Sequence, residues 1–490
     1  MTKKSAFPAP VYRDTVLAPV FTDAKRLFLS SMIEIDYAHL VMLTEQKIVP
    51  PAAAAACFGA LDALRRSEIV ATEFDGSFED LFFLLERKLA DICGAENAGR
   101  IHTARSRNDI DMTMYRMVLR ERLLQTMDAL LSLRARLIGL AAEHRSALMP
   151  AYTHNQPAQP TTLGHYLMAI VEVLERDSER IRSAFLRVNR SPLGACAITT
   201  TGFPIDRSRT QHLLGFDGLQ TNSYGAIASV DYITESCSVL AVTMLNVGRF
   251  TQDLLLWSTA EFGYLRLSDG YVQISSIMPQ KRNPVPLEHT RILASRALAE
   301  SQAVLSSLHN TPFADMNDSE DSLQPLLDLA FADGLRSLRL LDGVLSEATF
   351  NTGTMAARAE GGFLTVTELA DTLVRLTAMT FHDAHGLVSD AVKDSEGSFD
   401  RERVVAFVLE AVQRRGFAVP ERERLYRSLD AQNFVRVRTV AGGPAPEALD
   451  PEIARASAQL GQDRNCVAAL RDRIFAASQE LHAAAASMRP

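Results

Sequence analysis

Apolar side chains recur at helical spacing over long stretches of the chain, and alternating runs of β-branched residues are almost absent. The clearest helix is expected over 109–144. In it Leu123, Leu130 and Leu137 repeat every seven residues, and a second apolar stripe lies beside them. At about 1.5 Å per residue this helix is about 50 Å long. Two apolar stripes require that the helix be covered on two sides.

Four further long helices are expected, each set off by clusters of Gly, Pro, Asn or Asp. Their predicted ranges are 161–188, 226–262, 286–308 and 325–348. Five long helices in succession indicate an elongated bundle. Because their apolar surface exceeds what one bundle needs, we expect bundles to associate in a homo-oligomer.

The rest of the chain divides around this bundle. At 490 residues it is too long for one small core, so several domains are expected. We predict an N-terminal helical domain over 1–107, a central elongated bundle over 108–358 and a small C-terminal helical domain over 359–490. The pair Gly361 and Gly362 precedes the last set of amphipathic helices. The predicted fold class is all-α.

Composition excludes several kinds of partner. The net charge of −8 argues against a protein that acts on nucleic acid or binds an anionic membrane, although local arginines can still bind an anionic substrate. The five cysteines form no C-x-x-C pair, which gives no disulfide framework and no zinc site. The start of the chain lacks the apolar core of a signal peptide, and no transmembrane run is present. We therefore expect a cytoplasmic protein.

Candidate chemistry is densest in the segment SSIMPQKRN, residues 275–283. Ser275 or Ser276 can supply a base, and Lys281 and Asn283 can stabilise an anionic transition state. This set suits the removal of a proton next to a carboxylate. Read alone, the segment is equally well explained as a polar loop that caps the helix after it.

A second polar segment, HTARSRND, covers residues 102–109 and immediately precedes the longest helix. Ser106, Arg107 and Asn108 gather donors at a helix N-terminus, where free N–H groups and the helix dipole favour an anion. The guanidinium of Arg107 can bind a carboxylate through two parallel hydrogen bonds. The alternative is an ordinary helix cap with exposed arginines.

The third segment, YTHNQPAQP, covers residues 152–160 between two predicted helices. Thr153, His154 and Gln156 are closely spaced hydrogen-bonding side chains. A lone histidine such as His154 is more often structural than catalytic, so this segment gains meaning only beside the other two.

Together and in this order, the three segments resemble those of the fumarase/aspartase superfamily, and in particular its argininosuccinate lyase subfamily. HTARSRND is similar to HTGRSRND, with Ala104 in place of glycine, YTHNQPAQP to YTHLQxAQP, and SSIMPQKRNP to the signature GSSxMPxKxNP. The resemblance runs from about Phe78 to Val392. It implies three all-α domains, with central five-helix bundles that form the twenty-helix core of a homotetramer. Each active site would be built from three subunits.

The resemblance also implies roles for individual residues. Ser275 matches the general base and Lys281 the group that stabilises the aci-carboxylate, while His154 and Glu288 match a histidine and its carboxylate partner. The reaction implied is anti elimination from an N-substituted aspartate, giving fumarate and an amine reversibly, with no metal or organic cofactor. The residues expected to contact the substrate are Ser106, Arg107, Asn108, Thr153, Gln156, Ser276, Met278, Asn283, Asp315 and Glu320.

One departure lies in the loop itself, where Ile274 replaces the glycine that usually precedes the two serines. Glycine there supplies backbone freedom, so Ile274 is expected to stiffen the hinge or narrow the entrance. The substitution leaves open which of the two serines is better placed to remove the substrate proton. We assign the role of general base to Ser275.

The leaving amine is where the chain departs furthest from argininosuccinate lyases. The tyrosine, glutamine and lysine that hold the arginine end in that subfamily correspond here to Asp315, Glu320 and Leu323. Losing a lysine and gaining two carboxylates favours an amine with a second positive charge. We therefore predict a diamine leaving group, as in ethylenediamine-N,N′-disuccinate (EDDS) lyase. One alternative is an argininosuccinate lyase, in which Asp315 and Glu320 would simply lie in solvent at the start of a helix. A more remote alternative is a non-catalytic structural homologue.

Overall fold

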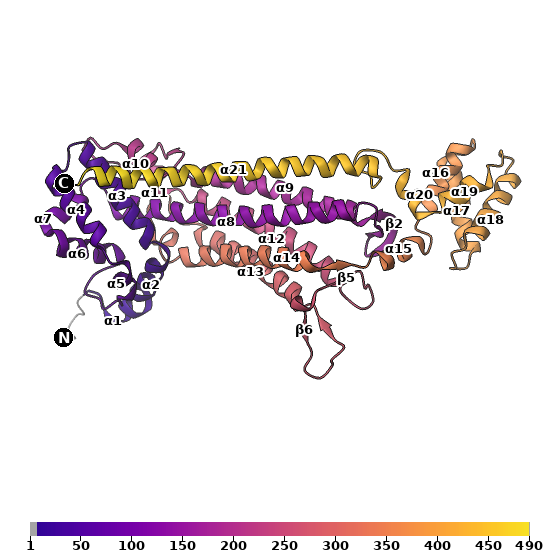
Figure 1. Ribbon diagram of the computed structural model, residues 1–490, viewed down its shortest axis with the longest axis horizontal. Coiled ribbons are helices and arrows are strands. Elements are labelled where there is room, and N and C mark those ends of the chain that lie inside the picture. Colours follow the sequence, from indigo (N-terminus) through magenta and orange to yellow (C-terminus); the bar gives the residue numbers. More distant parts are fainter. Residues whose placement is uncertain (1–6, 490) are drawn as a thin grey trace.

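The computed structural model describes residues 7–489, and within them the chain is an elongated assembly of helices with a few two-stranded strand pairs. Short helices gather at one end, a small group of C-terminal helices lies at the other, and long helices connect the two ends (Figure 1). The all-α prediction is confirmed.

The N-terminal helices pack around a core of their own that includes Phe21, Phe28 and Phe58. No single helix among residues 7–489 is long and apolar enough to cross a membrane. One bent pair of helices, Pro10–Leu27 with Leu29–Glu45, meets the length and composition of a membrane span, and by these two properties alone. The elements of this region are α1 (Pro10–Tyr12), the π-helix η1 (Arg13–Leu17), α2 (Ala18–Leu27), α3 (Leu29–Glu45), α4 (Pro51–Ala63), α5 (Arg66–Ala71), α6 (Leu81–Cys93) and α7 (Ala95–Ile101).

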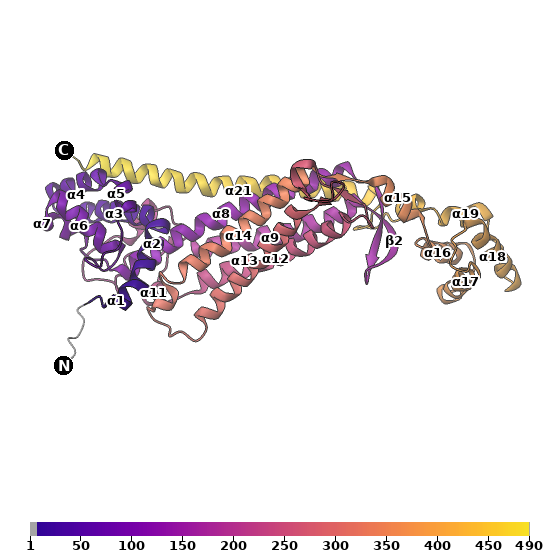
Figure 2. The ribbon, with the colours of Figure 1, turned by 90° about the horizontal axis from the view of Figure 1, so that it is seen from below.

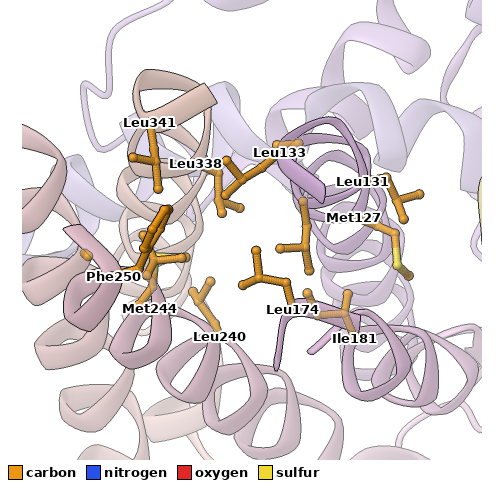
Figure 3. Close-up of a cluster of buried hydrophobic side chains, with 14 of the residues drawn as sticks. Met127, Leu131, Leu133, Leu174, Ile181, Leu240, Met244, Phe250, Leu338 and Leu341 are labelled. Atoms are coloured by element: carbon orange, nitrogen blue, oxygen red, sulfur yellow. The ribbon is translucent and has the colours of Figure 1, made fainter. Parts of the chain in front are cut away.

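The central bundle contains five long helices: α8 (Arg107–Glu143), α9 (Leu163–Val188), α12 (Asp231–Trp257), α13 (Val285–Leu308) and α14 (Gln324–Glu347). Their side chains converge on a continuous apolar core. Figure 3 shows Leu133 of α8, Leu174 of α9, Leu240 of α12 and Leu338 of α14 pointing into the same space. This core holds the helices rigidly along their length.

Both apolar stripes of α8 are buried inside the single chain. Leu123, Leu130 and Leu137 are fully buried, and so is Leu124 of the second stripe, because α8 packs against α9, α14 and α21 (Pro446–Ser487). The two stripes are therefore covered on both sides within one copy of the chain, and they give no support to association between bundles. The surplus apolar surface of the bundle lies on other helices.

Two predicted helix ranges need correction. The range 161–188 begins too early, because residues up to Thr162 belong to a strand and the Thr162 hydroxyl then caps α9 by accepting from the His165 N–H at 3.1 Å. The range 226–262 is broken into α11 (Ser223–Ala228) and α12, since Ser229 adopts an extended backbone between them. It also ends at Trp257 rather than at 262.

The segment after the bundle contains two structures rather than one compact unit. Helices α15 (Thr352–Glu360), α16 (Val366–Leu376), α17 (Phe381–Asp394), α18 (Arg401–Arg414), α19 (Arg422–Ser428) and α20 (Ala431–Arg436) lie at the far end. From there α21 returns along the bundle to the N-terminal helices (Figure 2). Leu460 and Val467 of α21 join the bundle core, Leu481 joins the N-terminal core, and Asp463 forms an ion pair with buried Arg134 at 2.6 Å.

Short elements connect the long helices and carry most of the polar segments. The largest is an antiparallel hairpin of β1 and β2 at the far end of α8, which the sequence reading placed simply between two helices. The remaining elements are β1 (Leu148–Thr153), β2 (Gln156–Thr162), β3 (Arg190–Ser191), α10 (Arg207–Leu213), β4 (Gly218–Leu219), β5 (Leu265–Arg266), η2 (Asp269–Tyr271), β6 (Gln273–Ile274), β7 (Arg282–Asn283), η3 (Asn317–Ser319) and β8 (Thr349–Phe350).

Candidate active site

The first group of candidate residues lies at the N-terminus of α8. Ser106 is the N-cap residue, and its hydroxyl donates to Asn108 Oδ1 at 2.5 Å. The amide of Asn108 in turn donates to Asp315 Oδ2, which brings the segment before α14 against the start of α8. Free N–H groups at this helix end favour an anion, and Asp315 adds a carboxylate beside them.

Arg107 is paired with two carboxylates of its own chain. Its Nη1 donates to Asp80 at 2.6 Å and to Glu79 at 3.0 Å, and its guanidinium lies over the ring of Phe83. Burial by itself lowers the pKa of Arg107, but the two carboxylates outweigh it and raise the pKa above its usual value. Asp80 is held in place because its other oxygen caps α6 by accepting from the Phe83 N–H.

A row of acidic side chains stands beside Asn108 and Arg107. Burial, and then the neighbouring Asp315, raise the pKa of Glu320 to about 8. Burial also raises the pKa of Asp321, which accepts from the Tyr115 hydroxyl at 2.5 Å, and the pKa of Asp111 is raised by burial and by the charges of Asp321 and Glu320. Burial first, and then mutual repulsion, therefore favour the neutral forms of these carboxyl groups.

Asp315 and Glu320 are half-buried rather than fully solvated. The second oxygen of Asp315, Oδ1, is buried and accepts from no N–H group among the described residues, and the carboxyl group of Glu320 is its acidic neighbour. A buried carboxylate oxygen without a donor is costly, so this position is suited to an N–H group of a ligand. Leu323, where argininosuccinate lyases carry lysine, is buried in the bundle core.

The second group lies at the tip of the β1–β2 hairpin. Thr153 pairs with Gln156, so His154 and Asn155 form a two-residue turn, and both have positive φ (52° and 59°). Two positive φ values are the requirement of a type I′ hairpin turn, and His and Asn tolerate them better than most residues do. The turn exposes Thr153, His154 and Gln156 to solvent at the end of the bundle.

The third group is the loop of residues 275–281, closed at its base by the antiparallel pair β6–β7. It projects away from the bundle (Figure 1). Ile274 and Ile277 are 79% and 83% exposed at its base and tip, while Ser275 is half-buried and Ser276 is exposed. Both isoleucines therefore lie apart from the apolar core of the bundle.

Ser275 differs from Ser276 in its surroundings. The Ser275 Oγ accepts hydrogen bonds from the N–H groups of Met278 at 3.1 Å and Ile277 at 3.4 Å. Donors aimed at this oxygen favour a negative charge on it. No hydrogen bond of the Ser276 hydroxyl occurs within residues 7–489. The geometry therefore distinguishes the two serines that the sequence left open.

The remaining residues of this group are arranged around the loop base. The Asn283 amide donates to the Gln273 carbonyl at 2.9 Å, which ties β7 to β6, and Lys281 is exposed with its N–H bonded to the Met278 carbonyl at 3.0 Å. Glu288 lies in the first turn of α13 and is exposed. The loop base is thus ordered, while Lys281 and Glu288 remain free to meet other groups.

Within one chain the three groups are not brought together. The residues around Ser106 and those around His154 lie at opposite ends of α8, whose 37 residues span about 55 Å. The β6–β7 loop projects from the side of the bundle. Ser106, Arg107, Asn108, Asp315 and Glu320 form one cluster, whereas Ser275, Lys281 and Asn283 form another.

The carboxylates Glu79, Asp80, Asp111 and Asp321 were missed by the sequence reading. Asp80 could have been found as a helix cap, because it precedes the apolar stretch of α6. The others carry no local signal. Within the described residues, no group of three or more His, Cys, Asp or Glu side chains is placed so that it could hold a metal ion.

Comparisons with known proteins agree with this architecture. A family described as "Lyase" matches residues 34–299. Argininosuccinate lyase 2 of Agrobacterium fabrum is 43% identical over 93% of this chain and 92% of its own, and argininosuccinate lyase of Methanoculleus marisnigri is 39% identical over 94% and 91%. An EDDS lyase variant solved with bound fumarate superposes with a TM-score of 0.86 and 32% identity over 96% of both chains.

These likenesses cover nearly the whole chain, at identities that reach well beyond a shared fold. They confirm the resemblance inferred from the three polar segments. The chain belongs to the argininosuccinate lyase subfamily of the fumarase/aspartase superfamily.

Proposed function

We propose that this carbon–nitrogen lyase cleaves an N-substituted aspartate into fumarate and an amine that carries a second positive charge. The Ser275 oxygen, as an alkoxide, takes the proton from the carbon next to one carboxylate. The released electron pair forms the double bond of fumarate as the C–N bond breaks on the opposite face. The bonding pair leaves on the amine nitrogen, which takes up a proton. The reverse reaction adds the amine to fumarate.

Support for Ser275 comes from the donors around its oxygen. An ordinary serine is a poor base, so its alkoxide must be stabilised. The N–H groups of Met278 and Ile277 already point at Oγ, and Lys281 supplies positive charge on the same loop. In this proposal Lys281 and Asn283 stabilise the aci-carboxylate, and Met278 and Ser276 complete the wall of the site.

The other carboxylate of the substrate is assigned to the start of α8. Ser106, Arg107 and Asn108 offer a hydroxyl, a guanidinium and an amide, and Thr153 and Gln156 add donors from the hairpin of another subunit. His154 would be paired with Glu288, which fixes the tautomer of the imidazole and raises its basicity. No metal or organic cofactor takes part in this scheme.

The observation that carries the proposed amine is the position of Asp315 and Glu320. Asp315 is hydrogen-bonded to Asn108, one of the residues assigned to the substrate, and its other oxygen accepts from no N–H group of the described residues. In a partly dry site a carboxylate there stabilises a second ammonium and repels the α-carboxylate that arginine carries. EDDS lyase is a structural neighbour, which agrees with a diamine product.

We further propose that the active enzyme is a homotetramer whose sites each draw on three subunits. The three groups of residues lie apart in one chain, so separate copies must supply them if they meet. Helices α12 and α13 leave large apolar side chains exposed, which is the surface that bundles would bury against one another. These side chains are Val242, Leu245, Leu256 and Ile292. A cytoplasmic location is part of the same proposal.

Argininosuccinate cleavage is the second candidate. It is favoured by the relatives named argininosuccinate lyase, which reach 43% identity over 93% of the chain. Against it stand the two carboxylates and the buried Leu323 in the region that would have to accept the amino-acid end of arginine.

The test is amine addition to fumarate, followed by the loss of fumarate absorbance. Ethylenediamine is compared with arginine at equal concentration, and argininosuccinate is offered separately for cleavage. Addition of ethylenediamine with little or no addition of arginine is expected. Efficient argininosuccinate cleavage without diamine addition would select the second candidate, and no reaction with any of these compounds would point to a different amine or to a non-catalytic chain.

A further inference from the structure

The carboxylate of Asp109 joins two segments that are far apart in the sequence. Asp109 is fully buried in the first turn of α8. Its Oδ1 accepts from the Ser106 N–H at 2.8 Å, while its Oδ2 accepts from the N–H groups of Gly194 at 2.8 Å and Cys196 at 3.0 Å. One side chain therefore holds both the start of α8 and the loop of residues 191–197.

The 191–197 loop has a shape that depends on such support. Gly194 and Cys196 both have positive φ, 86° and 54°, and the second of these is unfavourable for a residue with a side chain. On its other side Arg207 donates to the carbonyls of Leu193 at 2.9 Å and Pro192 at 3.2 Å. The Cys196 thiol points back to the Ala104 carbonyl at 3.2 Å, so the loop touches the substrate-binding segment directly.

A carboxylate is the group that fits between these donors. All three contacts are N–H groups, and an ionised carboxylate accepts on both oxygens. An asparagine at this position would have an NH₂ group in place of one of the two oxygens. That NH₂ group would face either the Ser106 N–H or the N–H groups of Gly194 and Cys196, so two hydrogen-bond donors would face each other. The bridge therefore depends on the charge of Asp109 as well as on its shape.

We propose that Asp109 is a positioning residue that holds Ser106, Arg107 and Asn108 in their substrate-binding arrangement by tying them to the 191–197 loop. The proposal rests on the proposed function, which assigns those three residues to the substrate carboxylate. Asp109 itself touches no reacting atom in this scheme. It acts through the backbone of Ser106 and through the loop that lies behind it.

Titration of this group gives the proposal a pH signature. Burial raises the pKa of Asp109 to about 6. The hydrogen bonds from the three N–H groups and the charge of Arg105 lower the pKa, but their combined effect is smaller than that of burial. The other charged or titratable groups that face it are Arg207 and the Cys196 thiol. Protonation below about pH 6 places an O–H against an N–H donor, so the bridge weakens as pH falls.

The experiment compares Asp109→Asn with Thr126→Val, measured on elimination from an N-succinyl diamine. Thr126 is a matched control: it lies on the same helix, is buried, and its hydroxyl contacts only the Arg122 carbonyl one turn back. In D109N the KM is expected to rise at least about tenfold while kcat changes less than about threefold, as one buried donor loses its acceptor. T126V should leave both constants near those of the wild type.

Two further readouts separate positioning from general destabilisation. Amide hydrogen exchange should increase together in residues 102–109 and 191–197 of D109N, and in neither segment of T126V. The wild-type KM should rise as pH falls through about 6, and the KM of D109N should be already high and flat. A drop in kcat alone, or exchange that rises over all of α8, would overturn the proposal. If the wild type shows no elimination at all, the proposed function has failed instead.

Discussion

The N-terminus of α8 and the β6–β7 loop carry the two halves of the proposed chemistry, yet the chain builds them in opposite ways. The start of α8 is surrounded by packed elements, with Arg107 paired to Asp80 and Asn108 bonded to Asp315. The loop of residues 275–281 projects from the bundle and exposes Ile277. One half is held by contacts with several elements of the chain, and the other by hydrogen bonds within the loop and at its base.

This difference predicts different effects on stability and on catalysis for substitutions at the start of α8 and for substitutions on the loop. Groups at the α8 end belong to a network of ion pairs and hydrogen bonds, so changing one of them alters the charge and the stability of its neighbours. Groups on the loop touch little of their own chain, so changing them should alter catalysis and leave folding intact.

The largest effect is expected for Ser275→Ala. Turnover should fall by at least about 10³, as when a positioned base or oxyanion donor is removed, while the melting temperature stays within about 1 °C because Ser275 holds no core. Ser276→Ala is the comparison variant, and its turnover should fall far less, because in this scheme Ser276 only contacts the substrate. An inactive Ser276→Ala with an active Ser275→Ala would move the base by one residue.

Arg107→Lys should come next, with kcat/KM lower by about 10², because a point charge cannot reproduce the planar donors that bind a carboxylate. The variant also loosens the contacts to Glu79 and Asp80, so unlike S275A it should change thermal stability. Steady-state kinetics and melting curves of Arg100→Lys, a half-buried arginine that pairs with Glu96 one turn away, provide the control. Unchanged fumarate binding in Arg107→Lys would remove the role given to this residue.

The double variant Asp315→Asn, Glu320→Gln should raise the KM for a diamine at least about tenfold, since neither side chain can then take on the negative charge that pairs with a second ammonium. Fumarate binding should change by less than about threefold. Competition assays with fumarate and with ethylenediamine separate the two effects. Asp318→Asn, in the exposed part of the same segment, is the control, and equal losses of both ligands would contradict the assignment.

The smallest effect concerns stability and pH. Because the pKa of Glu320 is raised to about 8 in the folded chain, its neutral form is favoured, and stability is lost as pH rises from about 4.5 through 8. Glu320→Gln removes this ionisation. Its melting temperature should match the wild type near pH 5 and exceed it by at least about 2 °C near pH 9. A constant difference across this range would contradict the raised pKa.

Sequence patterns predict the long helices best, because periodic apolar positions and terminal prolines act locally. The predicted starts of α13 and α14 differ from the observed ones by a single residue. The break at Ser229 was missed, since no Gly or Pro marks it. The β1–β2 hairpin was missed because its strands contain three prolines and its turn residues, His154 and Asn155, resemble an ordinary loop.

Other features depend on contacts that no local pattern encodes. The return of α21 along the bundle is fixed by apolar and ionic contacts such as Asp463 with Arg134, more than 300 positions apart. The pairing of Arg107 with Glu79 and Asp80 joins the start of α8 to the segment just before α6, and the contacts of Asp109 with the Gly194 and Cys196 N–H groups join α8 to a distant loop. The motif identified the candidate residues, while their partners follow only from the tertiary structure.

The central claim is that a complete site requires more than one copy of the chain. Co-expression of Ser275→Ala with His154→Asn, each carrying a different affinity tag, yields mixed oligomers that two successive purifications isolate. Random assortment should leave about one site in four with both groups intact, so the mixed species should regain lyase activity that neither parent shows. Mixed oligomers of the correct size that are as inactive as their parents would contradict the account.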